Sequence, residues 1–253
     1  MALHTFHTPH PVELELKIPA GDVEVETVDS EESTVTLDGD DRLVEQTAVE
    51  MVGNRLRVEL EGGKGPFGIT VAFGSFTIGR TPLRIRVRVP HDSRVELSTA
   101  AADMIVRGRV GSLETKSASG DLSVEADVAG NAIVKTVSGD VRMRAVGGEL
   151  RAQTVSGDIN VASVGGNIVA KSVSGDLRFE STREGHVTAQ SVSGDIRVGV
   201  APGTNLDVDA GSVSGDLDSE VALGSDAGNL GDGPVLVVRG KTVSGDFKVF
   251  RAA

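Results

Sequence analysis

The triplet Ser-Gly-Asp returns seven times along this chain and constrains its fold more than any other feature. The triplets begin at Ser119, Ser138, Ser156, Ser174, Ser193, Ser214 and Ser244. Their aspartates are separated by 19, 18, 18, 19, 21 and 30 residues. A period near twenty residues is typical of proteins built from stacked repeats. The chain is therefore expected to form a repeat array.

Apolar and polar residues alternate on both sides of each triplet. Leu150 and Ala152, for example, alternate with the polar residues Arg151 and Gln153. Alternation with a period of two indicates a half-buried strand. A second turn, Val-Gly-Gly in its clearest copies, follows about half a period later and leaves no room for a helix. The pattern predicts an all-β fold, a parallel β-solenoid with coils of about 18–19 residues stacked about 4.8 Å apart.

The triplet itself is typical of a tight turn. Glycine adopts a positive φ angle without steric cost, and the glycine of each triplet is expected to use it. Serine and aspartate side chains accept or donate hydrogen bonds to nearby backbone groups. Each aspartate is therefore expected to cap its own turn.

The repeat divides the chain into two regions of one continuous body. Residues 1–80 are β-rich but lack the triplet, and we expect them to form an N-terminal β cap with a Gly/Phe-rich hairpin. Residues 81–253 are expected to form the Ser-Gly-Asp repeat solenoid. Every solenoid has open strand edges at its ends. We expect the last coil, with Phe247 and Phe250, to cover the C-terminal one.

Composition excludes several classes of function. The formal net charge is −12 and the pI is about 4.9, which disfavours binding to nucleic acid because phosphate contacts need clustered Lys and Arg. The absence of cysteine excludes disulfides and thiolate metal sites and fits a reducing compartment. No apolar run is long enough for a membrane span, and residues 1–12 do not resemble a signal peptide. A cytoplasmic location is expected.

Three short motifs resemble a known bacterial family. They are Pro-Ala-Gly-Asp-Val at residues 19–23, Val-Pro at the end of a strand at residues 89–90, and the repeated Thr/Ser-Val-Ser-Gly-Asp-Ile/Leu. They resemble the β-strand-repeat family labelled "putative adhesin", which is grouped with the toast-rack domains. The resemblance covers nearly the whole chain and implies an all-β solenoid or roll with no known enzymatic activity. It also implies a link to envelope-associated or stress-response assemblies.

A column of aspartates is the first candidate metal site in the sequence. If the coils are in register, Asp140, Asp158, Asp176 and Asp195 lie about 4.8 Å apart, and like charges at that distance recruit cations. Calcium prefers six to eight oxygen ligands, however, and the opposite Val-Gly-Gly turn supplies no carboxylate. Turn capping is therefore favoured over calcium binding, and neither a metal site nor a cofactor is predicted.

The longest uncharged run, residues 65–79, is the candidate for binding a partner. Folded as a hairpin, it would place six apolar residues on one side: Phe67, Ile69, Val71, Phe73, Phe76 and Ile78. That side either packs on the solenoid as part of the cap or projects. A projecting apolar side would dock a partner, a second copy or a membrane surface.

These observations favour a non-enzymatic binding or scaffolding module. Its partner is expected to be another protein or a second copy of the chain. Two alternatives remain open, a calcium-binding adhesive β-roll and a degenerate polysaccharide-acting β-helix enzyme. The enzyme is disfavoured because the chain has neither Trp nor Tyr to stack on sugars and no Gly-x-Ser-x-Gly motif for a nucleophilic serine.

Overall fold

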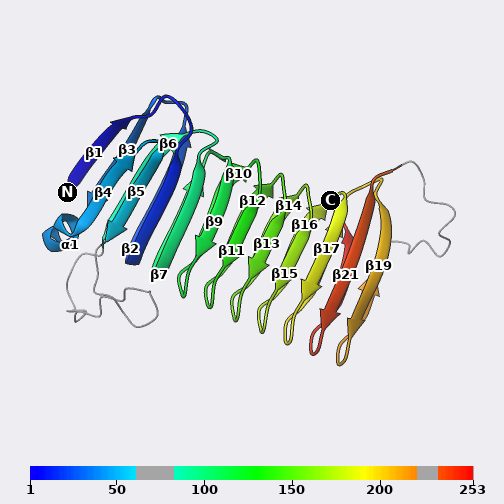
Figure 1. Cartoon of the computed structure of the whole chain (residues 1–253). Coiled ribbons are helices and arrows are strands. Elements are labelled where there is room, and N and C mark those ends of the chain that lie inside the picture. Colours follow the sequence, from blue (N-terminus) through cyan, green and yellow to red (C-terminus); the bar gives the residue numbers. More distant parts are fainter. Residues whose placement is uncertain (61–82, 221–232, 253) are drawn as a thin grey trace.

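The protein is a long parallel β-solenoid in a computed structural model that describes residues 1–60, 83–220 and 233–252 (Figure 1). Each coil contributes one strand to each of two facing walls. The strands of the first wall run, in spatial order, β9 (Ser112–Lys116), β11 (Ala132–Lys135), β13 (Leu150–Gln153), β15 (Ile168–Lys171), β17 (Gly185–Gln190), β21 (Val235–Thr242) and β19 (Asn205–Ser212). All of these pairings are parallel, as the repeat predicts.

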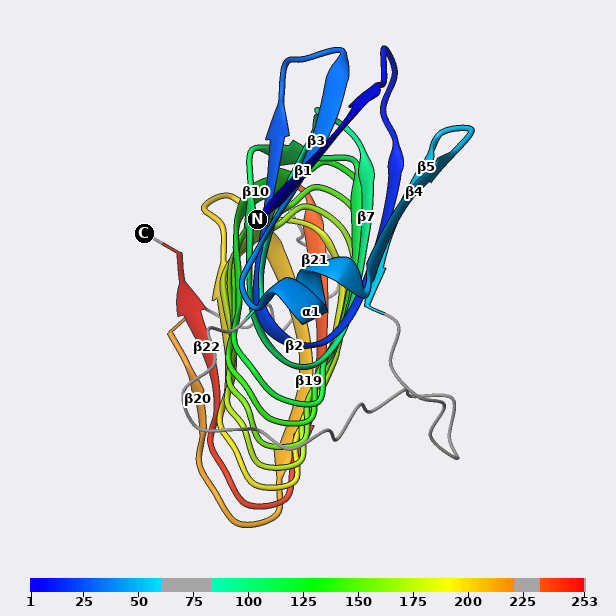
Figure 2. The same cartoon turned by 90° about the vertical axis from the view of Figure 1, so that its left-hand side faces the viewer.

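The second wall follows the same order. Its strands are β10 (Leu122–Val128), β12 (Val141–Val146), β14 (Ile159–Val164), β16 (Leu177–Thr182), β18 (Ile196–Val200), β22 (Phe247–Arg251) and β20 (Leu217–Ser219). Viewed along the stack, the coils superpose as nested loops (Figure 2). The predicted all-β parallel solenoid is confirmed.

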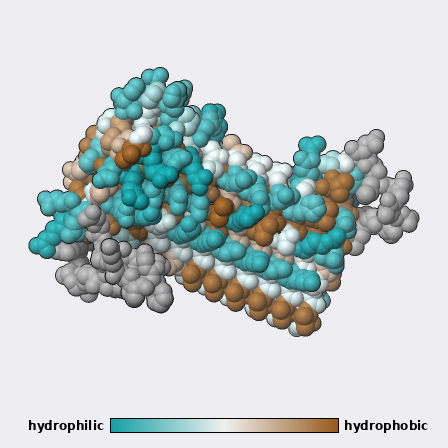
Figure 3. Space-filling view, in the orientation of Figure 1, coloured by the Kyte–Doolittle hydropathy of each residue, from teal (hydrophilic) through white to brown (hydrophobic). Residues whose placement is uncertain are grey.

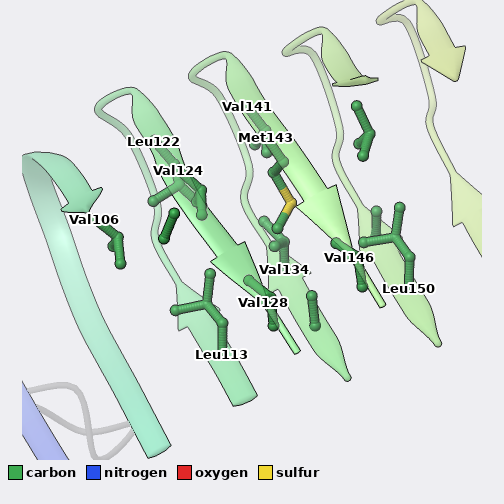
Figure 4. Close-up of a cluster of buried hydrophobic side chains, with 14 of the residues drawn as sticks. Val106, Leu113, Leu122, Val124, Val128, Val134, Val141, Met143, Val146 and Leu150 are labelled. Atoms are coloured by element: carbon green, nitrogen blue, oxygen red, sulfur yellow. The ribbon is translucent and has the colours of Figure 1, made fainter. Parts of the chain in front are cut away.

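The walls are held together by the inward residues of the alternating strands. Figure 4 shows this core between the two walls, with Leu113 and Val134 from the first facing Leu122 and Val141 from the second. The same positions are filled by apolar residues in successive coils, so the core is one continuous column. Burial of these side chains supplies the main driving force for stacking.

At the N-terminal end, the order of coils in space differs from their order in the sequence. The long strand β2 (Glu13–Val28) pairs in parallel with β7 (Arg94–Arg107) on one side. On its other side it pairs in parallel with β5 (Arg55–Leu60) and β6 (Arg84–Pro90). The first coil of the sequence is therefore the second coil of the solenoid.

Opposite charges fix the register of this outermost coil. Arg84, Arg86 and Arg88 of β6 lie opposite Asp22, Glu24 and Glu26 of β2, and each pair forms an ion pair. Opposite charges directly across neighbouring strands stabilise a register, whereas a shift by one residue would bring each arginine beside an uncharged residue.

Shorter elements extend the N-terminal end. β3 (Glu32–Asp38) pairs antiparallel with β6, β1 (Ala2–His7) pairs antiparallel with β3, and β4 (Thr47–Val52) pairs antiparallel with β5. Helix α1 (Asp41–Glu45) lies across the N-terminal opening, where Leu43 and Val44 pack against the core (Figure 2). The two-residue strand β8 (Arg109–Val110) pairs with β10.

The C-terminal end shows the same exchange of order. β22 lies between β18 and β20, and β21 lies between β17 and β19. The last coil of the sequence is therefore the penultimate coil of the solenoid. The expectation that Phe247 and Phe250 cover the open end is wrong, because Phe247 is buried inside the stack and β19 and β20 form the outermost coil. A spacing of thirty residues between the last two triplets accommodates the return of the chain.

Two sequence expectations lie outside the described residues. They are the boundary between residues 80 and 81 and the hairpin of residues 65–79. Among the described residues, no helix has the length and apolar character needed to cross a membrane.

Candidate binding surface along the turn edge

The Ser-Gly-Asp turns lie in one column along an edge of the solenoid, which we call the turn edge. Each turn is preceded by a threonine or serine whose side chain points inward. The Thr154 hydroxyl accepts a hydrogen bond of 3.0 Å from the Gly157 N–H, and the Ser172 hydroxyl accepts one of 2.8 Å from the Gly175 N–H. The hydroxyl thus closes its own turn from inside.

The glycines of the turns are required chiefly by their close stacking. A Cβ atom on Gly175 would lie 2.0 Å from the carbonyl oxygen of Gly157 in the coil before it. The predicted positive φ occurs in the triplets at Gly120 and Gly139, with values of 102° and 127°, but not at Gly175. The prediction was therefore wrong for the other triplet glycines, where an added Cβ atom would lie 2.0–2.4 Å from a carbonyl oxygen of a neighbouring coil: Gly157, Gly175, Gly194, Gly215 and Gly245.

The aspartates form a continuous ladder from coil to coil. The Oδ1 atom of Asp158 accepts a hydrogen bond of 2.9 Å from the backbone N–H of Asp176, and Asp176 accepts one of 2.8 Å from Asp195. The same bond links every neighbouring pair in the spatial order Asp103, Asp121, Asp140, Asp158, Asp176, Asp195, Asp246 and Asp216. Each aspartate therefore caps the turn of the next coil, not its own as expected.

This ladder occupies one oxygen of each candidate metal ligand. Of the four candidates, Asp140 and Asp195 also bind arginines through Oδ2, at 3.1 Å to Arg142 and 2.9 Å to Arg197. Among the described residues, no group of three or more His, Asp or Glu side chains is arranged to hold a metal ion. The aspartates of the ladder therefore link neighbouring coils by hydrogen bonds.

A row of exposed valines runs along the tip of the turn edge. We call it the valine ridge, and its members, in spatial order, are Val137, Val155, Val173, Val192, Val243 and Val213. Their exposed fractions lie between 44% and 82%, which is unusual for an apolar side chain repeated at one position. Figure 3 shows the ridge as a straight line of apolar side chains at the lower edge of the solenoid.

A column of long polar side chains flanks the ridge on the first wall. It contains Lys116, Lys135, Gln153, Lys171, Gln190 and Lys241, each at the end of a strand and each exposed. Together with the valines, most of these residues line an open groove of about 830 Å³. The groove combines apolar side chains with positive charge in an otherwise acidic chain.

The end of this column also carries the clearest shifts in pKa near the turn edge. The Lys116 ammonium binds the Glu114 carboxylate at 2.8 Å, and Arg94 lies 3.6 Å from the same carboxylate. The hydrogen bond from Lys116 lowers the pKa of Glu114, against the opposing effect of burial. The same bond raises the pKa of Lys116. Both groups are therefore charged at neutral pH.

The partner-binding residues predicted from the sequence lie outside the described residues. They are Phe67, Ile69, Val71, Phe73, Phe76 and Ile78. The valine ridge was missed, although the sequence contains its signal. In six of the seven repeats a valine directly follows an inward residue such as Thr154, so the alternation places Val155 outward. An apolar residue that is out of phase at the same position in successive repeats marks an exposed row.

Solved structures of similar shape include two bacterial proteins. A protein of Bacteroides fragilis described as a "putative adhesin" has a TM-score of 0.61 and 13% sequence identity, over 98% of this chain and 96% of that one. A protein of Parabacteroides distasonis described as a "putative lipid binding protein" has a TM-score of 0.57 and 15% identity, over 98% and 96% of the two chains. At these identities the similarity establishes the fold alone.

No curated protein sequence matches the chain. A sequence profile, however, matches residues 12–250, a span that begins just before β2 and ends in β22. The match includes the turn edge and both exchanged ends of the solenoid. The chain belongs to the family described as Toastrack DUF4097.

Proposed function

We propose that this protein is a non-enzymatic binding and scaffolding module that presents the turn edge to a protein partner. The observation that carries the proposal is the valine ridge, a continuous row of exposed apolar side chains that is repeated from coil to coil. Contiguous apolar patches on soluble proteins mark interaction sites. The names of the similar structures, adhesin and lipid-binding protein, both describe binding rather than catalysis.

The construction of the edge supports this role. The serine and aspartate side chains of the turns bond to backbone groups of neighbouring coils, and the turn glycines leave almost no space between coils. The ridge side chains are therefore held on a rigid backbone before any partner arrives. Preorganisation of this kind reduces the entropic cost of binding.

Photo-crosslinking in cells of the native host tests the proposal. A photoreactive amino acid replaces Val155 or Val173 in the full chain, and Val52, an exposed valine in β4 at the other end of the molecule, serves as the matched control. We expect the same covalent adduct from both ridge positions and none from Val52. We also expect the adduct at Val173 to disappear when Val155 and Val192 are replaced by lysine. Equal labelling at Val52, or no adduct at the ridge, would contradict the proposal.

We propose a cytoplasmic location as well, and the absence of cysteine, which fits a reducing compartment, supports it. Fractionation of the native host with an antibody against the chain measures it directly. Recovery of the protein in an envelope or extracellular fraction would overturn this part and leave the binding role intact.

A further inference from the structure

The turn edge carries opposite charges on its two flanks. The lysines lie on the first wall, immediately before the ridge, and the aspartate ladder lies immediately after it, where the second wall begins. In the central repeat, for example, Lys171 precedes Val173 by two residues and Asp176 follows it by three. Any partner that covers the ridge therefore meets lysines on one side and, on the other, the carboxylates of the ladder, of which Asp140 and Asp195 are already paired with Arg142 and Arg197.

This arrangement disfavours partners of uniform charge. An anionic membrane surface would attract the lysines but be repelled by the aspartates, and by the formal net charge of −12. A basic partner would be attracted by the aspartates but repelled by the lysines. The best match is a surface with an apolar row between a negative and a positive column, and this chain has one such surface of its own.

We propose that the partner of the valine ridge is a second copy of this chain, related by a twofold axis parallel to the direction in which the coils stack. Rotation about that axis brings the two ridges together tip to tip and places the lysine column of each copy against the aspartate ladder of the other. A twofold axis perpendicular to the stack would instead place the two lysine columns side by side and the two aspartate ladders side by side, with charges of the same sign on neighbouring steps. This inference rests on the proposed function of the turn edge and names its occupant.

The symmetry fixes which residues meet. Under the parallel twofold axis every ridge valine faces the same valine of the partner, because an isologous contact pairs each element with itself at its own height. Under the perpendicular axis Val155 would face Val243 instead, since these are the second positions from the two ends of the ridge.

The contact is long and narrow. Six coils with steps of about 4.8 Å give a ridge of about 24 Å. Such a contact falls below the size of a standard stable interface, so association is expected to be reversible, with a dissociation constant in the micromolar range or weaker. The flanking charges contribute orientation more than affinity.

Sedimentation of the full chain over a range of concentrations tests the proposal. We expect a monomer–dimer equilibrium whose dissociation constant rises at least tenfold in Val173→Lys and is unchanged in Val52→Lys. Val173 and Val52 are both exposed, so both variants should fold, and their melting temperatures confirm it. A dimer that is insensitive to Val173→Lys would overturn the inference.

Charge and crosslinking determine the orientation. Lys171→Glu should weaken the dimer if lysines face aspartates and strengthen it if they face lysines. The chain has no cysteine, so Val155→Cys introduces a single thiol. Under mild oxidation it should form a disulfide with the same residue of the partner, because the two sulfurs approach bonding distance only in the parallel arrangement. Crosslinking of Val155→Cys to Val243→Cys, and not to itself, would overturn the inference.

The outcomes also separate this inference from the proposed function. A chain that stays monomeric at the highest concentration, yet gives a heterologous adduct at Val155 and Val173, would exclude the second copy and keep the binding role. Sedimentation with vesicles containing phosphatidylglycerol, accompanied by loss of binding in Val173→Lys, would assign the ridge to a lipid surface instead. An adduct of twice the mass of the chain at both ridge positions supports both conclusions.

Discussion

Each turn requires glycine because the backbone of the neighbouring coil leaves no space for a side chain. A Cβ atom at Gly175 would lie 2.0 Å from the Gly157 carbonyl oxygen, a distance at which the backbone must move. We expect Gly175→Val to lower the free energy of unfolding by about 1–3 kcal/mol, as other overpacked sites do. Urea denaturation followed by circular dichroism measures the loss.

The matched control is Gly211, in the outermost strand β19, where an added Cβ atom meets nothing within 4 Å. Gly211→Ala should change stability by no more than about 0.5 kcal/mol. An equal loss at both positions would show that backbone freedom, and not the contact between coils, determines the requirement for glycine.

The aspartate ladder provides the second prediction at this scale. Asp176→Ala removes the acceptor of the Asp195 N–H and is expected to cost about 1 kcal/mol, the usual contribution of one such hydrogen bond. Asp176→Asn keeps an oxygen at the same place and relieves repulsion between neighbouring carboxylates, so it should be neutral or stabilising. Chemical denaturation compares the two variants. Equal losses would contradict a ladder based on hydrogen bonds.

Glu114 makes the stability depend on pH. The hydrogen bond from Lys116 lowers the pKa of this carboxyl in the folded state. A lowered pKa contributes stability above the unfolded value of about 4.3, and this contribution is lost as the pH falls through the folded value. We expect Glu114→Gln to cost less than about 1 kcal/mol at pH 7 and to cost less near pH 3 than at pH 7.

Urea denaturation at the two pH values measures this difference, and Glu50→Gln, at an exposed position of β4, serves as the control. A cost of Glu114→Gln that persists unchanged at low pH would show that the ion pair is not its source.

At the scale of the elements, the main finding is that the terminal coils of the sequence are internal coils of the solenoid. β2 has parallel partners on both sides, and so do β21 and β22. A coil paired on both edges resists fraying better than an end coil, because all its ladder hydrogen bonds are made. The outermost coils, β5 with β6 and β19 with β20, are each continuous in sequence with internal coils on both sides.

The inserted C-terminal coil depends on one close contact. The ring of Phe247 lies against Gly240, where a Cβ atom would be 1.9 Å from the nearest ring carbon. We expect Gly240→Ala to destabilise the protein by about 1–3 kcal/mol, because the buried ring has little space to move.

Phe247→Leu removes the ring carbons that would clash but leaves a cavity. The double variant should therefore lose less stability than the sum of the single variants, by at least about 0.5 kcal/mol. A double-mutant cycle in urea measures the coupling. Strict additivity would show that the two residues do not share this space.

At the scale of the whole molecule, the solenoid is stabilised by contacts between successive coils. Apolar residues fill the core in every repeat, and one carboxylate oxygen of each aspartate in the ladder accepts a backbone N–H of the next coil, as Asp158 does from Asp176. We therefore expect calcium to leave the melting temperature unchanged, measured by scanning calorimetry with and without the ion. A large rise on adding calcium, lost in Asp158→Asn, would support the calcium-binding β-roll.

The column of aspartates on the candidate surface could be predicted from the sequence, but the hydrogen bonds that its members form could not. The period of the triplet placed Asp158 and Asp176 in one column, because equal coil lengths bring equivalent residues into register. Which oxygen bonds to which N–H depends on the distance between turns, and the sequence does not contain that distance. The valine ridge could have been predicted from the alternation of inward and outward residues, because Val155 follows the inward Thr154.

The sequence by itself determined the local structure of this protein, namely strands from alternation, turns from Ser-Gly-Asp, and parallel stacking from the period. The tertiary structure alone decided which coil lies beside which. Coil backbones are nearly equivalent, so any coil can in principle pair with any other. The choice depends on contacts between residues far apart in the sequence, such as Arg86 with Glu24 and Asp246 with Asp195. The first and last coils of the sequence lie inside the stack for this reason, and no periodicity reveals it.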